Sequence, residues 1–292
     1  MTTRALTRTG AAGRARRHLL HLSQSAARAK SSFSLTPGFV IVGAQRCGTT
    51  SMFKTLMQHP DVAKPFLRKG IHYFDINYSN SWDWYRGHFP LSAPAQARRG
   101  GRPPLTGESS PYYMFHPRVP ARLAEDLPDA KVMVLLRDPV ERAYSGHAHE
   151  RARGYESLDF EAALEAEPKR LDGERERLLA DPAYDSPDWQ HHSYLTRGQY
   201  IDQLEVLEQV LGRDRLLVVD SGDFFTDPEP VFAEVRGFLG LRPHGGIVFE
   251  RHNARHRSPM EPGLRRRLEA HFAPYDERLV AWWGRVPSWR RE

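Results

Sequence analysis

From residue 39 onwards, short unbroken hydrophobic runs alternate with longer stretches in which hydrophobic residues recur every three or four positions. Unbroken runs of this length are typical of parallel strands buried on both faces, and the longer spacing is typical of amphipathic helices. The pattern predicts strands at 39–42, 131–136 and 216–219 and helices at 49–58, 139–153, 200–211, 230–239 and 265–272. Strands that alternate with helices predict an α/β fold in three layers, with a central, mostly parallel sheet flanked by helices.

Two stretches lack this alternation. Residues 1–32 are rich in Arg, Ala and Ser and contain no acidic residue, which predicts a basic, disordered tail. Residues 160–186 are strongly charged and are interrupted by proline and glycine, which indicates an exposed insertion. We therefore expect one folded domain over residues 33–292.

The first predicted strand ends in a glycine-containing loop that leads directly into a helix. Its sequence, Gly43-Ala44-Gln45-Arg46-Cys47-Gly48-Thr49-Thr50-Ser51, approaches the nucleotide-triphosphate pattern Gly-x4-Gly-Lys-Ser/Thr. The lysine of that pattern is missing, because Thr49 follows Gly48, and the positive charge lies instead at Arg46 within the loop. Backbone N–H groups and a helix N-terminus converge in such a loop, so we expect a P-loop-like fold that binds a phosphate or sulfate there.

A second anion-binding feature follows the strand at 131–136. Arg137 comes directly after this strand, and Asp138 and Pro139 then have the capping residue and first-turn proline of a helix start. Ligands of parallel sheets bind beyond the carboxyl ends of the strands, so Arg137 and the glycine loop are expected at one edge. Two such features predict a ligand with two separated anionic groups.

Together these two segments resemble one enzyme family. The loop at 43–50 resembles the 5′-phosphosulfate loop of sulfotransferases that use 3′-phosphoadenosine 5′-phosphosulfate, and the segment at 136–145 resembles their 3′-phosphate motif. The resemblance implies that Arg137 and Ser145 contact the 3′-phosphate. The residues that it implies for the phosphosulfate end of the donor are Gly43, Arg46, Cys47, Gly48, Thr49, Thr50 and Ser51.

Three further segments are similar to the carbohydrate branch of this family, which includes heparan sulfate N- and 3-O-sulfotransferases and their bacterial relatives. These segments are Lys69-Gly70-Ile71-His72-Tyr73-Phe74-Asp75, Gly107-Glu108-Ser109-Ser110-Pro111-Tyr112-Tyr113 and Asn253-Ala254-Arg255. The last falls where the family closes a loop over the nucleotide, so the resemblance implies donor binding by Arg255. The chain departs from the family pattern at Gly70, which replaces a glutamate that often serves as general base, and at Ser109, which replaces a lysine.

Sulfuryl transfer requires two partners held in line and stabilisation of the charge that develops on the leaving phosphate. Arg46 suits the leaving phosphate, and Lys69 suits the bridging oxygen or the transferred group. An acceptor hydroxyl also needs a base. His72, with an ordinary pKa of about 6.5, is one candidate. Glu108, expected directly after a short strand, is the second, and another group stays open as a third alternative.

Several side chains are candidates for contact with the acceptor. Asp75 is placed to orient His72, and Tyr112 and Tyr113 offer the aromatic faces that suit sugars and ring systems. The expected acceptor is a hydroxyl or amine of a glycan or related small molecule, with a carbohydrate hydroxyl favoured by the resemblance.

No metal is expected, because arginine and lysine supply the positive charge of the site. The histidines that lack the neighbouring cysteines or acids of a metal centre, and that we interpret as surface residues, are His147, His149, His191 and His192. Cys47 has no histidine partner nearby in the sequence, so we interpret it as a small loop residue and not as a nucleophile.

Composition narrows the class of protein. Hydrophobic residues make up 40% of the chain without a run of 18, which is typical of a soluble enzyme and predicts no transmembrane segment. A single cysteine indicates a reducing, cytoplasmic compartment. The net charge of +6 is concentrated at the ends, since residues 61–250 carry 23 basic and 31 acidic residues. This distribution favours local anion capture over binding of nucleic acid.

The leading interpretation is a single sulfotransferase domain at 33–292 that uses 3′-phosphoadenosine 5′-phosphosulfate. A P-loop kinase or NTPase is an alternative, which the missing loop lysine weakens and magnesium dependence would revive. A non-catalytic nucleotide-binding protein is another, prompted by Gly70. The identity of the acceptor and the oligomeric state stay open.

Overall fold

Over the residues that the structure describes, the central sheet contains four strands, all of them parallel, in the order β2-β1-β3-β4. The computed structural model describes residues 33–66, 69–97, 103–252 and 258–291. The strands are β1 (Phe39–Gly43), β2 (Gly107–Ser109), β3 (Lys131–Leu136) and β4 (Leu216–Asp220). Side chains of β1 and of Val132–Leu136 are fully buried, as expected for strands covered on both faces. The predicted three-layer α/β fold is confirmed, while the tail at 1–32 lies outside the described residues.

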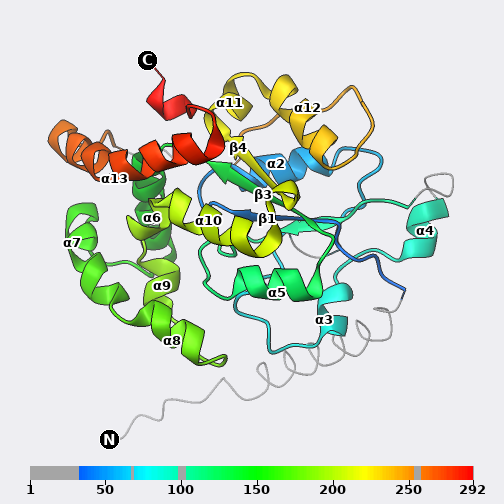
Figure 1. Cartoon of the computed structure of the whole chain (residues 1–292), viewed down its shortest axis with the longest axis horizontal. Helices are drawn as coiled ribbons and strands as arrows, with labels where there is room; N and C mark the ends of the chain where they lie inside the picture. Colours follow the sequence, from blue (N-terminus) through cyan, green and yellow to red (C-terminus); the bar gives the residue numbers. More distant parts are fainter. Residues whose placement is uncertain (1–32, 67–68, 98–102, 253–257, 292) are drawn as a thin grey trace, which may run out of the picture.

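Helices cover both faces of the sheet (Figure 1). Helices α2 (Thr49–Leu56), α11 (Ser221–Thr226) and α12 (Pro228–Phe238) lie on one face, and α5 (Val119–Asp126) and α10 (Tyr200–Leu211) lie on the other. The short helices α3 (Trp82–Arg86) and α4 (Ser92–Ala97) precede β2. Among the described residues, we find no helix with both the length and the apolarity needed to cross a membrane.

Helix α6 (Pro139–Arg153) begins and ends where the sequence predicts. The Asp138 side chain accepts a hydrogen bond from the backbone N–H of Val140 at 2.9 Å, which satisfies a free donor of the first turn. Gly154 ends the helix with φ +80°, a conformation that favours glycine. Because β3 and α6 are joined by only Arg137 and Asp138, this arginine is fixed at the carboxyl end of the sheet.

The expectation of an exposed insertion at 160–186 is wrong. These residues and their neighbours form α7 (Phe160–Leu171), α8 (Glu174–Ala180) and α9 (Pro187–His191). The glycine and prolines mark helix boundaries or are accommodated, since Gly173 caps α8 and Pro168 lies inside α7. The charged residues mask a buried apolar face that includes Leu164, Leu178 and Trp189.

The last helix is longer than predicted. Helix α13 runs over Pro262–Trp283, whereas the sequence pattern indicated 265–272. Pro274 lies within the helix without ending it, and the buried face continues beyond it through Leu279. Helix α13 packs against α10 and α6, so it supports the helix that carries Ser145.

Candidate functional site

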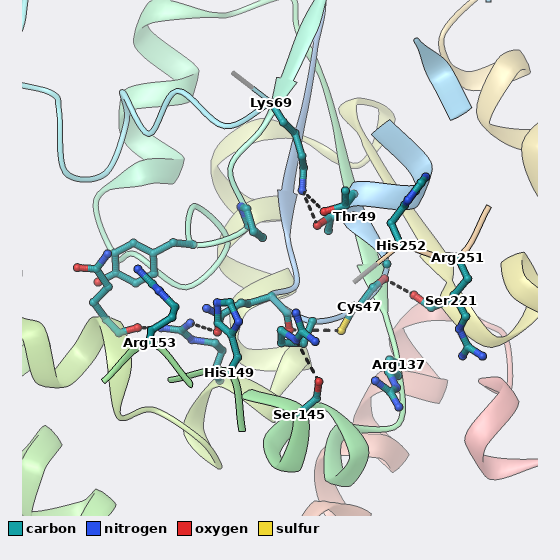
Figure 2. A pocket seen from close by; sticks show the side chains of 18 of the residues that line it. Cys47, Thr49, Lys69, Arg137, Ser145, His149, Arg153, Ser221, Arg251 and His252 are labelled. Atoms are coloured by element: carbon teal, nitrogen blue, oxygen red, sulfur yellow. Dashed lines mark hydrogen bonds between the residues drawn. The ribbon is translucent and has the colours of Figure 1, made fainter. Parts of the chain in front are cut away.

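A cavity of about 670 Å³ opens at the carboxyl ends of β1, β3 and β4 (Figure 2). Among the described residues, its lining includes six lysines and arginines but neither aspartate nor glutamate. The basic lining residues are Arg46, Lys69, Arg137, Arg153, Arg197 and Arg251. Low-dielectric walls with one sign of charge concentrate ligands of the opposite sign, so this cavity is built for an anionic ligand.

The glycine loop forms the floor of the cavity. Arg46 and Gly48 both have left-handed backbones, with φ +71° and +82°, and α2 begins at Thr49. The Ser221 hydroxyl, at the end of β4, donates a hydrogen bond to the Cys47 carbonyl and so ties the loop to a second strand. The loop therefore directs the N-terminus of α2 at the cavity, as the sequence predicts.

The two predicted anion-binding segments meet in this one cavity. Arg46 Nε donates to Ser145 Oγ at 3.0 Å, although 99 positions separate the two residues. Arg137 also lines the cavity, and its Nη2 lies 3.2 Å from Glu141 Oε2, one turn into α6. The geometry thus brings together the residues that the sequence assigned to the two ends of a dianionic ligand.

Lys69 lies over the start of α2 (Figure 2). Its Nζ donates to Thr50 Oγ1 at 2.9 Å and to Thr49 Oγ1 at 3.2 Å. Burial lowers the pKa of Lys69 to about 8. An ammonium held by two hydroxyls at a helix N-terminus is positioned to neutralise an oxyanion bound there.

His72 and Asp75 form a pair at the cavity wall. His72 Nδ1 lies 2.7 Å from Asp75 Oδ2, and the Asp75 carboxylate is fully buried behind it. Burial alone lowers the pKa of His72, but the hydrogen bond and charge of Asp75, together with the charge of Glu108, outweigh this effect and raise the pKa above its ordinary value. His72 lines the cavity, and its backbone is left-handed at φ +56°, a strained conformation typical of functional sites. Because the Asp75 carboxylate accepts a hydrogen bond from His72 Nδ1, the other ring nitrogen, Nε2, can accept a proton.

Glu108 lies within β2, so the expectation that it follows a strand is wrong. It is fully buried and does not line the cavity. Its Oε2 accepts from the Ile71 N–H at 3.0 Å and from the Ser110 hydroxyl at 2.7 Å. Its Oε1 accepts from the Tyr85 and Tyr113 hydroxyls at 2.9 and 3.0 Å. A carboxylate that accepts four hydrogen bonds and has no access to the cavity is not placed to act as a general base. It is placed to fix the segment that carries His72.

The other predicted residues are distributed between the cavity wall and its support. Tyr112 lines the cavity, whereas Tyr113 lies behind it on Glu108. Gly43 packs so closely on Met114 that an added Cβ would lie 2.6 Å from the Met114 Cβ. Ser51 supports the wall, because its hydroxyl accepts from the His252 N–H at 3.0 Å. Arg255 lies outside the described residues.

Burial raises the pKa of the Cys47 thiol, which keeps the sulfur protonated and unreactive. This environment supports the interpretation of Cys47 as a structural loop residue. Among the described part of the chain there is also no group of three or more His, Cys, Asp or Glu side chains suited to a metal ion.

Sequence reasoning missed one wall of the cavity. His149 and His191 line it, so their interpretation as surface residues is wrong, while His147 is buried against the Leu158 carbonyl. The further lining residues, which sequence analysis did not single out as site residues, are Gln45, Ile76, Pro111, Arg153, Gln190, Arg197, Ser221, Gly222, Phe225, Arg251 and His252. Ser221 and Gly222 follow β4 directly, so the rule that ligands bind beyond strand ends could have found them. No comparable rule identifies Arg197 from the sequence.

Comparison with known proteins gives a consistent result. The family described as "Sulfotransferase domain" matches residues 36–255. The human bifunctional heparan sulfate N-deacetylase/N-sulfotransferase 3 is 28% identical over 219 residues, covering 71% of this chain and 23% of its own length. The mouse heparan sulfate glucosamine 3-O-sulfotransferase 5 is 24% identical, covering 87% of this chain and 74% of its own. The chain thus spans less than a quarter of the bifunctional relative.

A solved structure shares the architecture. The crystal structure of a sulfotransferase from Alicyclobacillus acidocaldarius superposes with a TM-score of 0.65 at 31% identity. The match covers 88% of this chain and all of the other. The sheet and the helices around the cavity are therefore those of a known enzyme fold.

Proposed function

The chain belongs to the sulfotransferase family, and we propose that it transfers a sulfuryl group from 3′-phosphoadenosine 5′-phosphosulfate to a hydroxyl of a carbohydrate or related small molecule. One observation carries the choice of donor. Arg46 of the glycine loop and Ser145 of α6 meet at 3.0 Å in a cavity that Arg137 also lines. A loop that carries Arg46 and a strand end that carries Arg137, both lining one cavity, suit a nucleotide with phosphate on both the 5′ and 3′ sides.

Each end of the donor has its own set of protein groups. The N-terminus of α2 with Arg46 and Lys69 suits the 5′-phosphosulfate, because backbone N–H groups and cations stabilise charge there without reorganisation. Arg137 and Ser145 suit the 3′-phosphate. Lysine and arginine supply this charge directly, so binding of the donor needs no metal.

In the transfer itself, the acceptor oxygen forms a bond to sulfur as the bond between sulfur and the 5′-phosphate oxygen breaks. Lys69, held over Thr49 and Thr50, lies where it can neutralise the charge that develops on the departing phosphate. His72 takes the acceptor proton on Nε2, and Asp75 holds the ring and stabilises the imidazolium that results. The products are the sulfated acceptor and 3′-phosphoadenosine 5′-phosphate.

Gly70 stands where the family pattern that the sequence resembles has a glutamate, and the surroundings of Gly70 support His72 as the base. A Cβ added at Gly70 would lie 2.9 Å from the Ser109 carbonyl oxygen and 3.4 Å from His72 Nε2. The His72 ring therefore occupies the neighbourhood into which a side chain at position 70 would extend.

Calorimetry and product analysis together test the proposal. We expect 3′-phosphoadenosine 5′-phosphate to bind at least about tenfold more tightly than AMP, because a charge-assisted contact to the 3′-phosphate is worth about 1.5–3 kcal/mol. With the full donor and a pool of glycans, mass spectrometry should detect products that have gained one SO3.

Arg137→Ala provides the matched control, since it removes the proposed 3′-phosphate contact and leaves the glycine loop unchanged. The variant should bind AMP as the wild type does and lose the preference for the 3′-phosphate. Equal affinity of the wild type for both nucleotides would contradict the assignment of the donor.

A further inference from the structure

The short 3-10 helix η3 (Ser288–Arg290) follows α13 and packs against α11 (Figure 1). Neither Ser288 nor Trp289 lines the cavity, so a ligand bound there does not touch them. Two paths of contacts nevertheless lead from these two residues to the donor site. One path ends at the glycine loop, and the other ends at Arg137.

The first path begins where Ser288 binds Asp220, the last residue of β4. The Ser288 N–H donates to Asp220 Oδ2 at 2.6 Å, and the Ser288 hydroxyl donates to Asp220 Oδ1 at 2.7 Å. The Asp220 carboxylate is fully buried, and its Oδ1 also accepts from the N–H groups of Gly222 at 2.7 Å and Asp223 at 3.3 Å. Hydrogen bonds to an ionised carboxylate are strong, so Ser288 helps to fix the turn that joins β4 to α11.

This turn forms part of the cavity wall. Ser221 and Gly222 both line the cavity, and the Ser221 hydroxyl donates to the carbonyl of Cys47 in the glycine loop (Figure 2). Gly222 also packs closely on η3, since an added Cβ would lie 2.9 Å from the Ser288 Cβ. The path from Ser288 therefore ends at the loop that we propose for the 5′-phosphosulfate.

The second path begins at Trp289. Its ring meets the ring of Tyr200 edge-on, with the centroids 6.4 Å apart, and its Nε1 donates to the buried Asp276 at 2.9 Å. The fully buried Tyr200 donates from its hydroxyl to the Arg137 carbonyl at 2.9 Å. The same hydroxyl lies 3.6 Å from Cys47 Sγ, which is a weak hydrogen-bonding partner. The path from Trp289 therefore ends mainly at the residue that we propose for the 3′-phosphate.

We propose that Ser288 and Trp289 are positioning residues for the sulfuryl donor, Ser288 for its 5′ end and Trp289 for its 3′-phosphate. This proposal rests on the proposed function of the cavity. Groups that bind the donor act only when the residues behind them hold them in place, and a misplacement of about 1 Å by a distant change can cost about a hundredfold in rate.

Calorimetry with AMP and with 3′-phosphoadenosine 5′-phosphate tests both paths, because AMP has a 5′-phosphate but no 3′-phosphate. Ser288→Ala removes one hydroxyl from Asp220, so both nucleotides should bind about fivefold more weakly, as for the loss of one hydrogen bond. Trp289→Phe shortens the ring and removes its N–H. This variant should bind AMP as the wild type does, while its preference for the 3′-phosphate should fall about fivefold.

Thr106→Val is the matched control, because it also removes one buried hydroxyl, which donates to the Ala63 carbonyl at 2.8 Å. Thr106 precedes β2, at the edge of the sheet opposite the cavity. All three variants should melt below the wild type by about 2–4 °C. Only the control should keep both wild-type affinities, since a purely structural role changes the melting temperature and not the ratio of the two affinities.

A variant with the affinities of Thr106→Val overturns the role of its residue. Equal losses for both nucleotides in Trp289→Phe overturn its assignment to the 3′-phosphate. If Trp289→Phe does not fold, Tyr200→Phe removes the hydroxyl at the end of the same path, and an unchanged preference in that variant overturns the path.

The wild type distinguishes this proposal from the proposed function. Equal affinity for the two nucleotides contradicts the donor and removes the Trp289 path with it, while AMP still decides the Ser288 path. Failure to bind either nucleotide counts against the proposed function. Inorganic pyrophosphate then probes the basic cavity, and wild-type affinity for it in Ser288→Ala and Trp289→Phe overturns the positioning roles.

Discussion

Arg46 Nε donates a hydrogen bond to Ser145 Oγ at 3.0 Å, and this contact joins the glycine loop after β1 to the middle of α6. Arg46 reaches it from a left-handed backbone at φ +71°, which costs free energy for a residue with a side chain. The two proposed halves of the donor site are therefore directly connected. A change on one side should alter how the other side binds.

A double-mutant cycle of Arg46→Ala and Ser145→Ala measures this connection. Each single variant should weaken binding of 3′-phosphoadenosine 5′-phosphate, and the double variant should lose less than the two losses combined. For residues in direct contact we expect a coupling of about 0.5–3 kcal/mol. Isothermal calorimetry gives all four affinities, and strictly additive losses would show that the hydrogen bond is irrelevant to binding.

The sequence was sufficient to predict strands β1, β3 and β4 and helices α2, α6, α10 and α12, whereas helices α5 and α11 on the faces of the sheet were not predicted. The strand Lys131–Leu136 and the start of α6 were predicted to the residue, because a continuous buried run and a cap followed by proline are local signals. Helices α7 to α9 were missed, since their few buried residues lie among many charges. Their stability depends on contacts with α6 and the 3-10 helix after α9, which no local pattern reveals.

The pH dependence of activity should report the pair of His72 and Asp75. A base works only when deprotonated, and the raised pKa of His72 moves the acid limb of kcat/KM above the ordinary value of about 6.5. Asp75→Asn removes the charge that raises this pKa, so burial then lowers it and the limb moves to lower pH. The rate should also fall by about tenfold to a hundredfold, because general-base catalysis depends on the orientation of the ring. A profile of kcat/KM from pH 5 to 8 (about the range in which histidine titrates) checks this, and an unchanged acid limb in Asp75→Asn would exclude His72 as its source.

The alkaline side of the same profile should report Lys69. Its pKa of about 8 means that the unliganded protein loses this charge as the pH rises through about 8, and kcat/KM should fall with it. Lys69→Arg keeps a positive charge at every accessible pH, so the alkaline limb should move upward even if the rate at neutral pH decreases. An alkaline limb that is identical in Lys69→Arg and the wild type would contradict this assignment.

For the site, sequence motifs located the residues of the glycine loop, Arg137 and Ser145 better than those on the rest of the cavity wall. The glycine loop, Arg137 and Ser145 follow strand ends at fixed spacings, and these spacings alone bring them to one edge of the sheet. Arg197 reaches the cavity from a segment more than 140 positions after the loop, by packing that the sequence does not encode locally. The two candidate bases could be separated only by burial, because Glu108 points into the protein and His72 into the cavity.

Glu108→Gln tests whether this carboxylate positions the segment of His72. The amide has the same shape, but its NH2 group can only donate, so the two groups that face it lose their acceptor and must reorient or stay unsatisfied. We expect a loss of about 1–3 kcal/mol in the free energy of unfolding, measured in urea. Turnover should fall while donor affinity persists, and the acid limb of kcat/KM set by His72 should remain but move to lower pH, because the charge of Glu108 contributes to the raised pKa of His72. Disappearance of the acid limb in Glu108→Gln would instead identify Glu108 as the base.

Gly70 should tolerate no side chain, although the family pattern that the sequence resembles has a glutamate at this place. A Cβ would lie 2.9 Å from the Ser109 carbonyl oxygen, a backbone atom fixed by β2, and 3.2 Å from the Ser110 hydroxyl. Gly70→Ala should therefore cost about 1–3 kcal/mol in the free energy of unfolding, as overpacking does, and Gly70→Glu should lower activity further instead of raising it.

Gly237→Ala is the control, because a Cβ there meets no atom within 4 Å in helix α12 and should stabilise the protein by up to about 1 kcal/mol. Urea unfolding of the three variants checks this, and an active, stable Gly70→Glu protein would mean that the segment can shift and that the glutamate could take over from His72.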